Sequence, residues 1–184
     1  MKMKKNAFTL LELLVVMVIV AVISAVAIPS FFSMGKGMAK RTATSNIHST
    51  ISLSRQWAIT HREQVTFVLS KNGMIYNPTN NPHFTASTDS NAPACYYAVN
   101  DAGEIIQSIT SLPLGILAVP ETTTTGGANG PWPVTFKTDG GLTIGDPFII
   151  KIYQGHRLGE SFVFDYNNPN TITINWLTGG IKME

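Results

Sequence analysis

Residues 4–29 read KKNAFTLLELLVVMVIVAVISAVAIP, a short basic leader followed by a nearly uninterrupted apolar run. The run from Phe8 to Ile28 is about 21 residues long, enough for a helix to span the hydrocarbon core of a bilayer. It contains one carboxylate, Glu12, near its start. A carboxylate at the centre of a spanning helix costs about 2.5–3.5 kcal/mol on insertion scales, and less near an interface. A simple anchor gains nothing from such a residue, so we expect Glu12 to have a partner.

The segment Phe8-Thr9-Leu10-Leu11-Glu12 after a basic leader resembles the N-terminus of type IV pilins and type II secretion pseudopilins, with Pro29 at the helix kink of that family. The resemblance implies cleavage between Ala7 and Phe8 by prepilin peptidase, and N-methylation of Phe8. It also implies that Glu12 pairs with the N-terminal amine of a neighbouring subunit. The family usually has Gly before the cut, where this chain has the small residue Ala7.

Two other interpretations of this segment stay open. Ala25-Val26-Ala27 fits the cleavage site of a secretory signal peptide. The apolar run also fits an ordinary single-pass anchor. Neither interpretation explains Glu12. Basic residues lie on both sides of the run, so charge does not set its orientation, and a cytoplasmic leader rests on the resemblance. These residues are Lys2, Lys4 and Lys5 before the run and Lys36, Lys40 and Arg41 after it.

The composition indicates one β-rich extracytoplasmic domain after the N-terminal segment. The chain has 184 residues, a net charge of +2 and 13% charged residues, whereas about 25% is usual. Such a small net charge does not by itself require a nucleic-acid partner. Cys95 is the only cysteine, so it forms no internal disulfide. We expect it to be a small buried core residue.

The helical pattern resumes after Pro29. Gly35 and Gly37 are poor helix formers, and together with the proline they predict an interruption. From Lys40 onward an apolar stripe recurs at helical spacing, with Leu53 and Trp57 beside it. We expect this stripe to cover a β-sheet. Its residues are Ala43, Ile47, Ile51, Ser54 and Ala58.

Short strand patterns follow, and turn residues separate them. Asn72-Gly73 and Asn100 to Gly103 predict hairpin turns, and Asn77 to Ala94 and Thr122 to Gly130 predict long loops. The predicted strands are Gln64–Leu69, Met74–Tyr76, Cys95–Val99, Glu104–Thr110, Ile116–Val119, Val134–Lys137, Phe148–Tyr153, Glu160–Tyr166 and Thr171–Trp176.

A long helix followed by a run of strands predicts an α+β domain. This is similar to the pilin fold, in which a long N-terminal helix packs on antiparallel β-sheets. The expected division is a leader peptide at 1–7, a transmembrane and assembly helix at 8–30, an amphipathic helix half at 31–62 and a periplasmic β-rich domain at 63–184.

Within this family the chain most resembles the GspH/FimT type of minor pseudopilin. The resemblance implies a structural subunit that initiates or tips a type II secretion pseudopilus. The alternative is a minor type IV pilin acting in DNA uptake or adhesion. The implied partners are other pilins, prepilin peptidase and the inner-membrane assembly platform. The chain would cross the inner membrane once, with its C-terminal domain in the periplasm. The matching residues are Trp57-Ala58-Ile59, Leu112-Pro113-Leu114-Gly115, Val134-Thr135-Phe136, Asp139-Gly140, Ile172-Thr173-Ile174 and Thr178-Gly179.

No spacing in the sequence indicates an enzyme, a metal site or a cofactor. The histidines lack metal-ligand spacing, and no nucleophile elbow is present. For DNA, the candidate contacts are Lys151, Arg157 and Lys182, with His156 nearby. Phosphate neutralisation needs several cations together, so we expect weak nucleic-acid binding at most. The histidines are His48, His61, His83 and His156.

Overall fold

The computed structural model describes residues 10–71, 94–121, 130–158 and 161–184, and the side chains of residues 26–36, 157 and 161 lie outside this description. The chain divides into two compact units, Met1–Met38 and Ala39–Glu184. The predicted strand Met74–Tyr76, its hairpin and most of the two predicted long loops lie outside the described residues.

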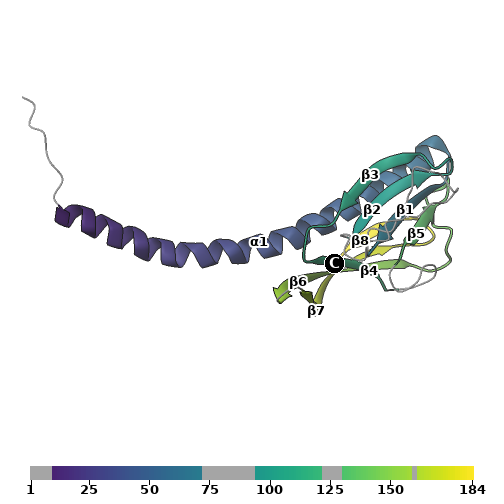
Figure 1. The fold of residues 1–184 in the computed structure, drawn as a ribbon. Coiled ribbons are helices and arrows are strands. Elements are labelled where there is room, and N and C mark those ends of the chain that lie inside the picture. The colour runs from purple at the N-terminus through teal and green to yellow at the C-terminus, as the bar shows by residue number, and fades with distance from the viewer. Residues whose placement is uncertain (1–9, 72–93, 122–129, 159–160) are drawn as a thin grey trace, which may run out of the picture. The chain divides into compact units, whose positions relative to one another are not determined.

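One helix, α1, runs from Leu10 to His61 (Figure 1). Its backbone is helical through Pro29, Gly35 and Gly37, where the sequence predicted an interruption. Proline removes one helical hydrogen bond but keeps a helical φ, and each glycine costs only about 1 kcal/mol relative to alanine. These local penalties do not end the helix.

The second part of α1 buries the predicted stripe. Ile47, Ile51, Ser54 and Ala58 have no exposed surface, and Ala43 is 1% exposed. The buried hydroxyl of Ser54 donates to the carbonyl oxygen of Thr50, 2.8 Å away, so its polar group is satisfied inside the helix. The prediction of this helix face is confirmed.

The unit Ala39–Glu184 contains two antiparallel four-stranded sheets, which confirms the α+β class. In strand order, the first sheet contains β3 (Ile105–Ser111), β2 (Cys95–Asn100), β1 (Val65–Ser70) and β5 (Trp132–Phe136). The second contains β4 (Ile116–Pro120), β6 (Phe148–Leu158), β7 (Ser161–Ile174) and β8 (Ile181–Met183).

The predicted strands that correspond to β1–β5 agree with the observed ones within two residues at each end. The sequence divided β7 at Asn167 to Asn170, but the structure has one strand there. The register steps from Ile152↔Asn170 to Gln154↔Asp165, so residues 166–169 form a bulge instead of a turn. The short strand β8 was missed.

The core joins the helix stripe to both sheets. Ile47 and Ile51 belong to the same buried cluster as Phe67 of β1 and Ile150 and Ile172 of the second sheet. Cys95 is also buried, as predicted. Its burial raises the pKa of the Cys95 thiol, because desolvation penalises the thiolate.

Candidate functional site

The first part of α1 exposes large apolar side chains all round its axis. From Leu10 to Ile23 their exposed fractions range from 45% for Val15 to 84% for Leu10. A surface helix of a soluble protein normally has one apolar stripe and one polar face. Over the residues that the structure describes, no helix is long and apolar enough to cross a membrane.

Glu12 lies in the first turn of α1 as the structure describes it. It is the one acidic residue of the apolar segment from Phe8 to Ile28. The backbone of Pro29 is part of the same helix. Ala7 and Phe8, the residues of the expected cleavage site, lie outside the described residues.

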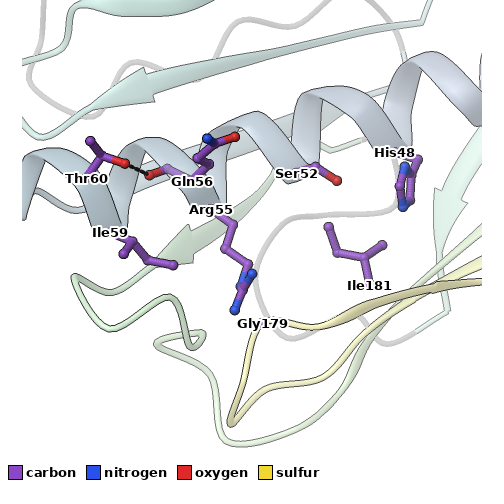
Figure 2. A pocket seen from close by; sticks show the side chains of 8 residues that line it. All are labelled: His48, Ser52, Arg55, Gln56, Ile59, Thr60, Gly179 and Ile181. Atoms are coloured by element: carbon purple, nitrogen blue, oxygen red, sulfur yellow. Dashed lines mark hydrogen bonds between the residues drawn. The ribbon is translucent and has the colours of Figure 1, made fainter.

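A groove of about 370 Å³ lies between α1 and the end of the second sheet. Figure 2 shows Arg55 reaching from the helix to the turn at Gly179, between Ile59 and His48. The Nε of Arg55 donates to the carbonyl oxygen of Thr178, 3.1 Å away. The lining residues are His48, Ser52, Arg55, Gln56, Ile59, Thr60, Gly179 and Ile181.

The turn that receives Arg55 is closely packed. The side-chain oxygen of Asn175 accepts hydrogen bonds from the amides of Leu177 and Thr178. Gly179 has a φ of +63°, and a Cβ there would lie 1.8 Å from the carbonyl oxygen of Gly140. Only glycine fits this position. Sequence reasoning missed Arg55, because its contact with Thr178 spans 123 residues.

Comparison with known proteins identifies both the N-terminal segment and the fold. Residues 2–28 match the prokaryotic N-terminal methylation motif. The fold is similar to the crystal structure of the type IV minor pilin FimU from Pseudomonas aeruginosa PAO1 in space group P21. The TM-score is 0.50 and the identity 13%, over 78% of this chain and 87% of that chain. The motif and the fold together support a type IV pilin-family protein.

A second crystal form of FimU from the same organism, in space group P65, has a TM-score of 0.49 and 13% identity, over 78% of this chain and 91% of that chain. No curated protein matches this chain.

The motif and the fold are those found in type IV pilins. The pilin family suggests association with other pilins and processing by prepilin peptidase. The prepilin motif also suggests a membrane-anchored pilin that is assembled into a filament.

The register places two of the predicted DNA contacts on one face of the second sheet. Lys151 lies opposite Thr171, and Lys182 lies opposite Thr173, and residues two apart on a strand share a face. Each lysine has an acidic partner. Lys151 Nζ lies 2.6 Å from Oε1 of Glu121, and Lys182 pairs with Glu184.

These two ion pairs shift the pKa values of the lysines. Hydrogen bonds to Glu121 and Glu184 raise the pKa of Lys151 and Lys182 respectively, and the bond from Lys182 lowers the pKa of Glu184. Each pair offsets the positive charge of its own lysine. For Arg157, only the backbone is described, paired with Phe162.

The three histidines that the structure describes lie apart. His48 lines the groove, His61 stacks on Trp57 with ring centroids 3.9 Å apart, and His156 is exposed on β6. His83 lies outside the described residues. Among the residues that were described, no three metal-ligating side chains come together.

Proposed function

We propose that this chain is a minor pilin or pseudopilin of the GspH/FimT type, a structural subunit that initiates or tips a type II secretion pseudopilus. One observation carries the proposal. The helix that overlaps the methylation motif exposes apolar side chains all round from Leu10 to Ile23, with Glu12 in its first turn. Fully burying one large apolar side chain contributes about 1.5–3 kcal/mol. Such a helix gains most by entering first a bilayer and then a bundle of similar helices.

In this proposal residues 1–7 are a cytoplasmic leader that prepilin peptidase removes, and residues 8–30 cross the inner membrane once. Residues 31–62 form the amphipathic half of the helix, and residues 63–184 lie in the periplasm. The buried stripe that includes Ile47 and Ile51 supports this division, because the helix changes there from apolar all round to one apolar face. The assembly platform of the inner membrane is the expected partner at this stage.

The proposed role of Glu12 is to bind the N-terminal amine of a neighbouring subunit, with Phe8 as the methylated first residue. A carboxylate and an amine attract each other strongly where the surroundings have a low dielectric constant. The pairing also offsets the cost of keeping Glu12 inside an apolar bundle. Pro29 would adjust the course of the helix in the filament.

The alternative function, DNA uptake or adhesion by a type IV pilus, has less support. The paired Glu121 and Glu184 neutralise Lys151 and Lys182, and nucleic-acid binding needs several uncompensated cations. The structural role therefore remains the better proposal.

The proposed function is tested by shearing filaments from cells that produce the secretion system and probing them for this chain. We expect the chain in the filament fraction, and its loss from that fraction when prepilin peptidase is deleted. A chain that stays in the membrane fraction of wild-type cells would contradict the proposal.

A further inference from the structure

The strands β6 and β7 continue beyond their sheet as a two-stranded arm, which we define as residues 155–158 and 161–165. The pairing of β4 with β6 stops at Ile116↔Gln154, and β8 pairs with β7 only from Ile172 to Ile174. One more backbone bond follows, from the amide of Gly155 to the carbonyl oxygen of Gly115, 2.7 Å away. Within the described part of the chain, residues 156–158 and 161–163 pair only with each other. Figure 1 shows the paired ends of β6 and β7 projecting from the sheet. A two-stranded ribbon alone is marginally stable in water, so a supporting surface would stabilise the arm.

The arm exposes apolar side chains on both faces. Leu158 is 67% exposed, Val163 is 43% exposed and Phe162 is 38% exposed. The register places Phe162 opposite Arg157 and Val163 opposite His156, so these two apolar residues point to opposite faces.

Glycines make room for the aromatic rings of the arm. A Cβ on Gly155 would lie 2.8 Å from Cδ1 of Phe164, and one on Gly115 would lie 3.2 Å from Cε1 of Phe162. Leu114, next to Gly115, is 83% exposed and extends the apolar surface. An exposed apolar surface rich in aromatic residues indicates an interaction site.

Three contacts show at which end of the domain the arm lies. Thr178 bonds to Arg55 of α1, and Asn170, earlier in the chain, bonds to Thr44. Asn168, earlier still, bonds to Lys40. Thus β7 runs backward toward the N-terminal end of the helix within the unit Ala39–Glu184. The arm continues past Asn168, at the end of the domain that is joined to the N-terminal segment.

Basic residues gather at this end. Lys40 donates from Nζ to the carbonyl oxygen of Asn168, 2.5 Å away, Arg41 is exposed beside it, and the arm itself contains Arg157. The nearby carboxylate of Asp165 accepts a hydrogen bond from the amide of Asn167. Apolar and aromatic side chains next to lysine and arginine are typical of elements that lie in a membrane interface, and anionic lipids attract such cations.

We propose that the arm inserts Leu158, Phe162 and Val163 into the interface of an anionic membrane, as a second and shallow attachment of the chain. This inference rests on the proposed membrane anchor.

Spin labels on the full chain in phosphatidylcholine–phosphatidylglycerol vesicles test the proposal. In a Cys95→Ala background, single labels are placed through Val163→Cys in the arm, Val18→Cys in the apolar helix and Ile109→Cys on β3. Ile109 is a matched control, because it is 41% exposed and Val163 is 43% exposed. Accessibility is measured to oxygen, which enters lipid, and to a water-soluble nickel complex.

We expect the ratio of oxygen to nickel accessibility at position 163 to exceed that at position 109 several-fold, and to fall when phosphatidylglycerol is omitted. Leu158→Cys provides a second reading if Val163→Cys does not fold. A position 163 that resembles position 109, while position 18 lies in lipid, would overturn the arm proposal and leave the anchor intact. A position 18 in water would overturn the anchor itself. A signal at position 163 that is lost on dilution of the protein in lipid would assign the arm to a second copy of the chain and overturn the proposal.

Discussion

Arg55 on α1 and Thr178, before β8, are joined by a hydrogen bond of 3.1 Å from Nε to the carbonyl oxygen. The bond ties the helix to the last turn of the second sheet, 123 residues later in the chain. The groove of Figure 2 lies around this bond.

Replacing Arg55 should loosen this turn. We expect Arg55→Ala to lower the stability of the domain by about 1 kcal/mol, because a typical net hydrogen bond contributes that much. Thermal unfolding of the full chain in detergent measures the change. Arg41→Ala is the control, since Arg41 is exposed on the same helix and surface substitutions usually stay within about 0.5 kcal/mol. Equal melting of both variants would show that the bond to Thr178 contributes nothing.

Gly179 should tolerate no side chain. Gly179→Ala combines a positive φ with a Cβ 1.8 Å from the carbonyl oxygen of Gly140, and we expect a loss of roughly 2 kcal/mol or more. Gly145→Ala is the matched control, because a Cβ there meets nothing within 4 Å. Chemical denaturation compares the two. A Gly179→Ala variant as stable as Gly145→Ala would mean that the turn is packed differently.

DNA binding should be weak. Lys151 and Lys182, two of the three candidate contacts, are held in ion pairs, so we expect only non-specific affinity, typically about 10⁻⁴–10⁻⁶ M at physiological salt. A gel-shift titration measures it. Sub-micromolar binding that disappears in the double variant Arg157→Ala with Lys182→Ala would favour DNA capture over the structural role.

Glu12 should act in assembly and not in folding. We expect Glu12→Ala to remove the chain from sheared filaments while its domain melts at the unchanged temperature, because the variant lacks only the proposed partner of the amine on Phe8. Asp101→Ala, which removes an exposed carboxylate from the domain surface, is the control and should assemble normally. Normal assembly of Glu12→Ala would remove the basis for the proposed pairing.

Local patterns in the sequence predicted much of the fold. The stripe through Ile47 and Ile51 was visible because helical spacing repeats within a few residues. The burial of Cys95 was predicted from the apolar strand residues that follow it. Each of these signals lies within one element.

The features that sequence reasoning missed depend on contacts between distant segments. Residues 166–169 have the composition of a turn, but pairing with β6 holds them in a bulge. Glu121 reaches Lys151 only because Val119 lies opposite that lysine in the sheet. The partner of Arg55 on the last turn has no local signal either. In the candidate site, the sequence predicted the N-terminal motif. It did not predict the groove around Arg55 or the ion pair of Lys151 with Glu121.

The residue at which the mature chain begins tests the pilin assignment most directly. Intact-mass and peptide mass spectrometry of the chain, purified from cells that contain prepilin peptidase, should find a protein that begins at N-methylated Phe8, with residues 1–7 removed. A chain that begins at Ile28, cut after Ala25-Val26-Ala27 as by signal peptidase, would contradict this processing and with it the proposed assembly through Glu12.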